Sequence, residues 1–142
     1  MKINIRKLNY EDYHEYINLI NQFRSINCEI SNEKFIEIYD IIFKSNIIFV
    51  AEYNNKLLGS ITLNIEQKFI HQLSKYIRIE DLIVHRDYRH NSIGSDLIKH
   101  VINYSKEINA YKITLTCNEN LVNFYIKNNF EIYNIHMSQL LN

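Results

Sequence analysis

The spacing of hydrophobic residues changes several times along the chain, and each change predicts a different element. Ile3 and Ile5 alternate with polar neighbours, which predicts a short first strand. Apolar residues at helical spacing predict one helix over residues 10–23 and a second over residues 31–42. The polar segment between them, residues 24–30, is expected to be a loop.

From residue 47 onward the hydrophobic period shortens to two. Residues 47–53 and 57–65 therefore predict two strands. Asn54-Asn55 lies between them and suits a hairpin turn, because asparagine tolerates positive φ. Gly59 inside the second strand indicates a bulge or a close approach of another part of the chain to the backbone.

The most informative stretch is a central strand, residues 79–84, followed by a polar loop and a helix over residues 92–106. This order directs backbone N–H groups and a helix N-terminus toward an anion. Gly94 stands in the first turn of that helix, where glycine costs about 1 kcal/mol relative to alanine. The chain has only two glycines, so one kept at this cost indicates that another group approaches the backbone closely at Gly94.

The last third of the chain predicts a strand at 111–115, a short helix at 118–127 and a closing strand at 130–137. The element order is β-α-α-β-β-β-α-β-α-β, which predicts a single α/β (α+β) domain over residues 1–142. Early strands meet in hairpins and later ones are separated by helices, so the sheet is expected to be mixed. The predicted site is a cleft where the central strand and the strand after its helix separate.

Composition narrows the possible classes of function. The formal net charge is +0 at pH 7, so the chain lacks the positive field typical of nucleic-acid-binding proteins. Cys28 and Cys117 lie far apart without Cys-x-x-Cys spacing, which indicates neither a zinc site nor a disulfide framework. No apolar run approaches the ~18 residues of a membrane span, and the first residues form no signal peptide. We expect a cytoplasmic protein that binds no metal, nucleic acid or membrane.

The element order and the loop at residues 89–94 resemble the GNAT superfamily of acyl-CoA-dependent N-acetyltransferases. Particular runs are similar to the branch that acetylates glucosamine 6-phosphate, namely residues 65–71 (IEQKFIH), 79–84 (IEDLIV), 111–115 (YKITL), 123–125 (NFY) and Phe130. The resemblance covers essentially the whole chain. It implies a mixed, mostly antiparallel sheet with helices on both faces, acetyl-CoA as co-substrate, direct attack of an amine on the thioester, no metal, and a homodimer with the last strand at its interface.

The resemblance also implies how acetyl-CoA is bound. Backbone N–H groups of the loop and helix start would bind its pyrophosphate, from Arg89, His90, Asn91, Ser92, Ile93 and Gly94. His90 and Ser92 replace glycines that are common in the superfamily, and we expect Asn91 to supply the positive φ instead. The alternative for this segment is a helix start with a solvated basic turn.

The catalytic roles implied by the resemblance fall on the central strand and the short helix. Asp81, Leu82 and Ile83 would line the open strand edge, where a backbone N–H polarises the thioester carbonyl. Glu80 and Asp81 would hold the hydroxyls and amine of the sugar. Adjacent strand residues point to opposite faces, so one acid could alternatively be merely exposed. Tyr125 would protonate the departing thiolate, although a tyrosine in a chain with 11 of them is more often a packing residue.

A phosphosugar pocket is implied at Ser25, Lys68, Phe69, Ile70, His71, Glu80, Asp81, Tyr111 and Lys112. Taken singly, a lysine or histidine is normally a solvated surface residue. Three positions depart from the resembled pattern: Thr116 replaces an acidic residue, Leu121 an asparagine and Leu140 an arginine of the partner subunit. These departures leave two alternatives open, namely an acetyltransferase acting on another small amine and a catalytically silent CoA-binding module.

Overall fold

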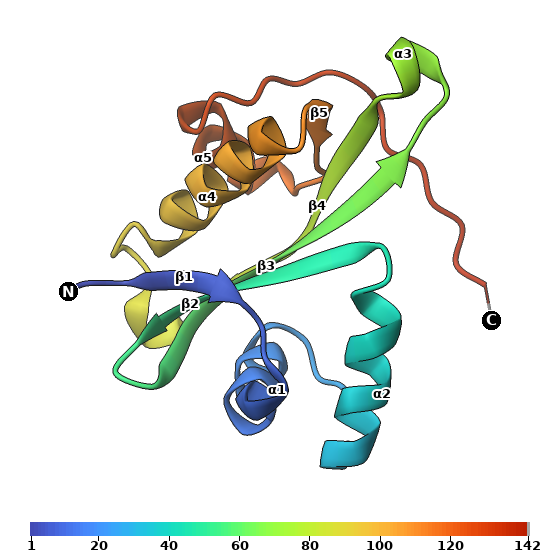
Figure 1. The fold of residues 1–142 in the computed structure, drawn as a ribbon. Coiled ribbons are helices and arrows are strands. Elements are labelled where there is room, and N and C mark those ends of the chain that lie inside the picture. Colours follow the sequence, from blue (N-terminus) through green and yellow to red (C-terminus); the bar gives the residue numbers. More distant parts are fainter. Residues whose placement is uncertain (142) are drawn as a thin grey trace.

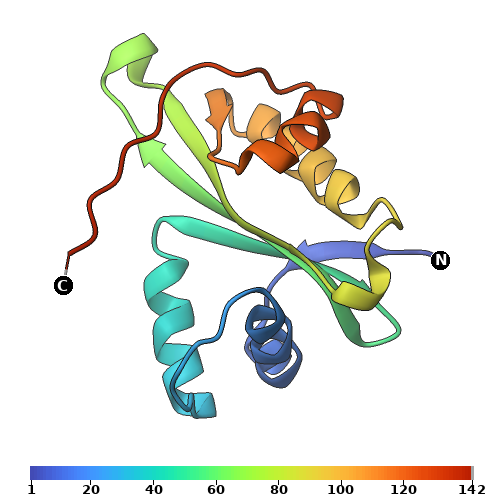
Figure 2. The same cartoon turned by 180° about the vertical axis from the view of Figure 1, so that it is seen from behind.

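A five-stranded mixed sheet runs through the molecule and carries helices on both faces (Figures 1 and 2). The computed structural model describes residues 1–141. Strand order follows the sequence, with antiparallel neighbours from β1 to β4 and a parallel pair between β4 and β5. This confirms the predicted mixed sheet. The strands are β1 (Asn4–Lys7), β2 (Asn46–Tyr53), β3 (Lys56–Gln67), β4 (Lys75–Val84) and β5 (Ala110–Thr114).

Two helices cover one face of the sheet and two cover the other (Figure 1). On the first face lie α1 (Tyr13–Phe23), which follows η1 (Tyr10–Asp12), and α2 (Asn32–Ile42). On the second lie α4 (Ile93–Glu107), which follows η2 (Arg86–Tyr88), and α5 (Val122–Lys127), which follows η3 (Glu119–Leu121). The short α3 (Ile70–Leu73) forms the tip of the β3–β4 hairpin. No helix within residues 1–141 has the length and apolar character needed to cross a membrane.

Strand β2 shows why helices are needed on both faces. Ile48 and Val50 belong to the core shared with α1 and α2, whereas Ile47, Phe49 and Ala51 belong to the core shared with α4. Successive strand side chains point to opposite faces, so an almost continuous apolar run requires a cover on each side. Full burial of such an aliphatic side chain contributes about 1.5–3 kcal/mol.

Gly59 lies where α4 packs against the sheet. A Cβ atom there would come within 3.0 Å of the Ile83 carbonyl oxygen and of side-chain atoms of Ile93 and Leu97. The β2–β3 register also shifts beside it, between Ala51 and Glu52. Both features predicted for Gly59, a bulge and a close approach, are therefore present.

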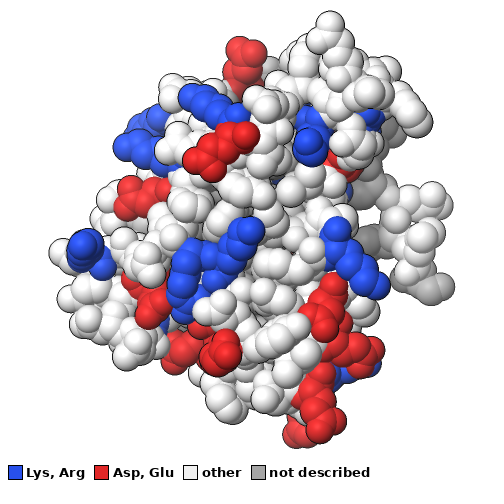
Figure 3. Space-filling view, viewed as in Figure 1, with Lys and Arg blue, Asp and Glu red and all other residues white. Residues whose placement is uncertain are grey.

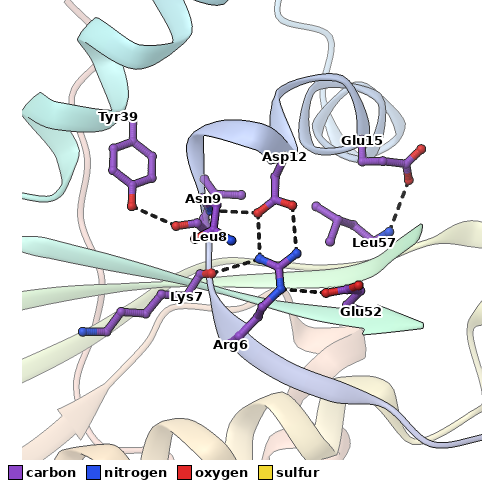
Figure 4. A network of polar contacts seen from close by, with 9 residues as sticks. All are labelled: Arg6, Lys7, Leu8, Asn9, Asp12, Glu15, Tyr39, Glu52 and Leu57. Atoms are coloured by element: carbon purple, nitrogen blue, oxygen red, sulfur yellow. Dashed lines mark hydrogen bonds and ion pairs between the residues drawn. The ribbon is translucent and has the colours of Figure 1, made fainter. Parts of the chain in front are cut away.

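An ionic network joins the edge strand β1 to the first helical turn and to β2 (Figure 4). The Arg6 guanidinium donates two 2.8 Å hydrogen bonds to the Asp12 carboxylate and one of 2.6 Å to Glu52. Burial acts to raise the pKa of Asp12, but Arg6 and the Asn9 backbone N–H outweigh it and hold that pKa below its ordinary value. The network fixes β1 against the start of α1. Basic and acidic side chains both occur over the face of the molecule seen in Figure 3.

The predicted closing strand at residues 130–137 is wrong. The described residues after α5 form neither helix nor strand, and they run past the β3–β4 hairpin as an extended tail (Figures 1 and 2). Ile132, Ile135 and Met137 are 78%, 89% and 87% exposed. Alternation in this segment fits a strand, but a strand also needs backbone pairing with a neighbour, and this segment pairs with none of the strands within residues 1–141.

Candidate active site

The candidate site begins where β4 and β5 part. Their parallel pairing runs from Lys75 with Ala110 to Arg78 with Thr114. Beyond that point β4 continues to Val84 while β5 ends, so the last part of β4 pairs only with β3. This separation occurs at the carboxyl ends of the two strands, where the sequence predicted it.

A bulge in β4 shapes the open edge. Ser60 pairs with Ile83 but Thr62 pairs with Glu80, so β4 contains one more residue than β3 across this step. Within this bulge, Asp81 adopts a left-handed backbone conformation, with φ of 50°. A bulge bends a strand and redirects its side chains. It also interrupts the alternation of the strand at Glu80 and Asp81, and both of these side chains are exposed.

The two acids of the bulge differ in their surroundings. The Glu80 carboxylate forms a 2.9 Å ion pair with Arg78, and both side chains are 47% exposed. The Asp81 charge lies close enough to the Tyr16 phenol to influence it. Burial raises the pKa of Tyr16 to about 12, a shift that the Ser60 hydroxyl opposes and the charge of Asp81 increases. Tyr16 of α1 therefore stays protonated behind the bulge.

The loop before α4 takes its positive φ values at His90 (74°) and Ser92 (56°). The expectation that Asn91 supplies this conformation is wrong, because its side-chain amide instead donates a 3.1 Å hydrogen bond to the Tyr88 carbonyl. The helix begins at Ile93, and Ser92 forms no side-chain cap. The first N–H groups of α4 are thus left without a capping side chain, as an anion site requires.

Gly94 has an ordinary helical backbone, since no glycine has positive φ. A Cβ atom at this position would lie 3.2 Å from Cζ of Phe124 and 3.7 Å from a methyl group of Val84. The close approach expected at Gly94 is therefore made by the Phe124 ring of α5, which packs against the first turn of α4.

Tyr125 follows Phe124 in α5 and is 8% exposed. Its ring makes edge contacts with Phe124 and Phe130, with centroids 5.0 Å and 5.9 Å away. Burial raises the pKa of Tyr125, and the neighbouring Cys117 raises it further. The phenol therefore keeps its proton throughout the neutral range, as a general acid must.

A second group of predicted residues gathers around the ring of Tyr76 in β4. Lys68 Nζ lies 5.2 Å and Lys112 Nζ 4.7 Å from the ring centroid. His71 stacks on Tyr111 at 3.9 Å and lies 6.2 Å from Tyr76. The structure thus brings together Lys68, His71, Tyr111 and Lys112, although they come from the β3–β4 hairpin and from β5.

A polar cavity of about 230 Å³ adjoins this group on the β4–β5 pair. Neither Tyr76 nor Arg78 was among the predicted site residues, although both line it. Period two along β4 places Tyr76, Arg78 and Glu80 on one face, which is the signal that would have found them. The cavity is lined by Glu66, Tyr76, Ile77, Arg78, Lys112 and Thr114.

Three predicted substrate residues do not join the group around Tyr76. Phe69 and Ile70 lie at the hairpin tip, where they are 92% and 60% exposed. The Ser25 hydroxyl lies in the loop after α1 and donates a 2.7 Å hydrogen bond to the Asn27 side chain. In this arrangement none of the three contributes to the basic group.

The chain matches the model of the acetyltransferase (GNAT) family over residues 11–130. It belongs to the GNAT family. This GNAT acetyltransferase is 31% identical to glucosamine 6-phosphate N-acetyltransferase 1 of Dictyostelium discoideum, across 96% of its own chain and 89% of that protein. It is also 28% identical to glucosamine 6-phosphate N-acetyltransferase of Arabidopsis thaliana, across 95% and 94% of the two chains.

Solved structures agree with the assignment of this chain to the GNAT family. The crystal structure of glucosamine-6-phosphate N-acetyltransferase from Arabidopsis thaliana superposes with a TM-score of 0.92 at 25% identity, covering 100% of both chains. An acetyltransferase from Trypanosoma brucei gives a TM-score of 0.93 at 24% identity over 99% and 100% of the chains, which shows the shared fold. The GNAT-like architecture expected from the sequence is confirmed.

The three departures from the family pattern also have clear positions in this GNAT acetyltransferase. Thr116 lies just beyond β5, with its hydroxyl oxygen 3.4 Å from Nδ1 of His136 in the tail. Leu121 is 42% exposed in η3, and Leu140 is 90% exposed near the end of the tail. Within residues 1–141 no three His, Cys, Asp or Glu side chains form a group that could hold a metal ion.

Proposed function

We propose that this GNAT acetyltransferase transfers the acetyl group of acetyl-CoA to the amine of glucosamine 6-phosphate, forming N-acetylglucosamine 6-phosphate. The observation that carries the proposal is its nearly full-length similarity to relatives named for this reaction, in organisms as distant as Dictyostelium discoideum and Arabidopsis thaliana. The arrangement of charged side chains around the β4–β5 opening supports it independently.

The start of α4 supports the binding of acetyl-CoA. His90 and Ser92 adopt left-handed conformations, and the first turn of α4 has no side-chain cap. Exposed N–H groups at a helix N-terminus bind phosphate oxygens without needing a positive side chain. Arg89 to Gly94 would hold the pyrophosphate of the co-substrate, directing its thioester toward the open edge of β4.

The edge of β4 at the bulge and Tyr125 have separate roles in the reaction, namely oxyanion stabilisation and proton donation. A backbone N–H on the edge formed by Asp81, Leu82 and Ile83 stabilises the oxyanion that develops when the amine attacks the thioester carbonyl. Asp81, exposed on the bulge, is available to bind the ammonium form of the substrate. Tyr125 then donates its proton to the sulfur as the carbon–sulfur bond breaks. Neither a covalent enzyme intermediate nor a metal is required.

The basic group around Tyr76 suits the phosphate of the substrate. Lys68 is paired with Glu66 at 2.9 Å, but among residues 1–141 Lys112 forms no ion pair and lies over aromatic rings. An unpaired lysine at the edge of a polar cavity favours a dianionic ligand. The same cluster would repel a polyamine, so it favours the sugar phosphate over a polycationic acceptor.

The extended tail and the free edge of β5 support a homodimer. β5 is the last strand of the sheet, so one of its edges has no partner within residues 1–141. Five apolar tail residues beyond Phe130 expose most of their side chains, namely Ile132, Ile135, Met137, Leu140 and Leu141. An unpaired edge beside an exposed apolar segment is a typical subunit interface, and a second copy of this chain would cover both.

A thiol-release assay tests the function directly. Purified protein is incubated with acetyl-CoA and with glucosamine 6-phosphate, glucosamine or spermidine, and free CoA thiol is measured over time. We expect the highest kcat/KM on glucosamine 6-phosphate. Comparable rates on spermidine would contradict the sugar assignment. Acetyl-CoA that raises the melting temperature without turnover on any amine would instead identify a silent binding module.

A further inference from the structure

The tail places one titratable side chain at the end of β5. His136 Nδ1 lies 3.4 Å from the Thr116 hydroxyl oxygen, twenty residues away in sequence. Tyr133, three residues earlier in the tail, covers the Lys112 ammonium at 5.8 Å from its ring centroid. The tail is thus held to β5 and the residues that follow it by two separate contacts, one polar and one cation–π.

Thr116 lies on the far side of the β4–β5 opening from the acidic bulge. Parallel pairing ends with Arg78 opposite Thr114, and Thr116 follows two residues later, where the two strands have already parted. The residue after Thr116 is Cys117, which is close enough to Tyr125 to affect its pKa. The His136 imidazole, in contact with Thr116, therefore lies just beyond β5, where β4 and β5 separate.

An imidazole at this point can accept a proton at neutral pH, which none of the side chains of β5 can do. Acetylation requires the ammonium form of the substrate to lose a proton before it can attack. Histidine exchanges a proton in the neutral range, and the hydrogen bond made by one ring nitrogen determines which nitrogen remains free. When Nδ1–H donates to the Thr116 hydroxyl, Nε2 is left unprotonated and can accept a proton.

Resting on the function proposed above, we propose that His136 accepts the proton from the substrate ammonium and that Thr116 positions its ring. Thr116 is itself unable to serve as a base, so the tail supplies the basic group from another part of the chain. Thr116 is a positioning residue, because it acts through the imidazole.

His136 Nε2 takes one proton from the ammonium group and passes it to solvent. The freed nitrogen lone pair forms the carbon–nitrogen bond, and the carbonyl π pair moves to oxygen. When the oxyanion collapses, the carbon–sulfur pair leaves on sulfur, which takes the Tyr125 proton. The nitrogen then loses its second proton, and Tyr125 is reprotonated through solvent.

Chemical rescue tests the assignment. His136→Ala should lower kcat on glucosamine 6-phosphate about 100-fold, in the range of general-base catalysis, with the KM for acetyl-CoA unchanged. Because His136 is exposed, imidazole added to the buffer should reach the vacated position and raise the rate of the variant in proportion to its concentration. A second variant, Thr116→Asp in the His136→Ala background, should restore activity by placing a carboxylate at the same point. Thr116→Val alone should lower kcat less than His136→Ala does.

His14→Ala is the matched control, since His14 is an exposed histidine on α1. It should keep the wild-type rate and show no response to imidazole. A wild-type rate in His136→Ala, or a reduced rate that neither imidazole nor Thr116→Asp restores, would overturn the role of His136 while leaving the proposed function intact. A wild-type protein that acetylates no amine would overturn both.

Discussion

Tyr125 combines the two properties that a proton donor to a thiolate needs. Its ring is fixed between Phe124 and Phe130, so the phenol has a defined position. Burial and the nearby Cys117 raise its pKa, so the protonated form predominates at neutral pH. A tyrosine at such a site holds a proton that the sulfur can accept as the carbon–sulfur bond breaks.

Tyr125→Phe should keep the packing and remove the proton. We expect kcat to fall about 10²- to 10⁴-fold, while the Kd for acetyl-CoA measured by calorimetry stays unchanged. Because the pKa of Tyr125 is raised, the wild-type rate should decline only when the pH rises above the ordinary tyrosine range of about 10. Tyr104→Phe, at a half-buried position on α4, serves as the control. An unchanged rate in Tyr125→Phe would remove the phenol from the mechanism.

Lys112 is the residue on which phosphate recognition most depends. Lys112→Met keeps a long unbranched side chain next to Tyr76 but removes the ammonium that lies over its ring. Charge-assisted hydrogen bonds contribute about 1.5–3 kcal/mol, so the KM for glucosamine 6-phosphate should rise about 10- to 100-fold with kcat little changed. The KM for glucosamine, which has no phosphate, should not move. Lys99→Met, at an exposed position on α4, is the control, and equal effects of both variants would contradict a phosphate contact.

Single residues also show where prediction from sequence stops. Lys68, His71, Tyr111 and Lys112 could be grouped because their motif implied it, and the structure does bring them together around Tyr76. The conformation of Asp81 could not be predicted, because a bulge depends on the register of two strands rather than on the residue that occupies it. Likewise, nothing in the order His-Asn-Ser indicated that the two residues beside Asn91 would take positive φ.

At the scale of elements, the spacing of hydrophobic residues was sufficient to predict the helices and strands that bury an apolar face. The helices α1, α2 and α4 and the strands β2 to β4 each carry an apolar stripe long enough to establish their type and approximate bounds. The segment 130–137 has the same alternation but pairs with no strand within residues 1–141. Pairing is a property of two segments together, so a strand at the end of a chain is the hardest element to predict from one pattern.

The Arg6 network gives an element-scale prediction about β1. Arg6→Met should lower the free energy of unfolding by about 1–3 kcal/mol at pH 7, because it leaves the half-buried Asp12 and Glu52 carboxylates without their cation. The folded-state pKa of Asp12 lies below its ordinary value of 3.8, so its contribution is present above that value and disappears as the pH falls through the folded pKa. The difference between wild type and Arg6→Met should therefore shrink between pH 5 and pH 2.

Urea denaturation at several pH values measures this difference. Lys34→Met is the matched control, because Lys34 forms an ion pair with Glu37 in which both side chains are more than half exposed. Such a pair contributes at most about 1 kcal/mol. A loss in Arg6→Met that stays constant from pH 7 to pH 2 would show that the guanidinium contributes through packing rather than through its charge.

At the scale of the whole molecule, the two edges of the sheet differ. β1 is an edge strand of four residues, and a short edge strand limits further pairing. β5 and the tail instead present an unpaired edge and a series of apolar side chains. Specific subunit interfaces bury about 1,200–2,000 Å² in total, and an extended tail of this kind can supply much of that area from each of two copies.

The proposed homodimer predicts how the tail behaves when it is altered. Ile135→Lys places a charge on a side chain that is 89% exposed in the single chain, so it should leave the fold intact but convert the dimer to a monomer in sedimentation velocity at micromolar concentration. Asn134→Lys adds the same charge at the neighbouring exposed position and should leave the dimer in place, because it removes no apolar side chain from the tail. The melting temperature of wild type should rise with protein concentration, whereas that of Ile135→Lys should not. Wild-type protein that sediments as a monomer at every concentration would contradict the dimer, and the exposed tail would then need a different partner.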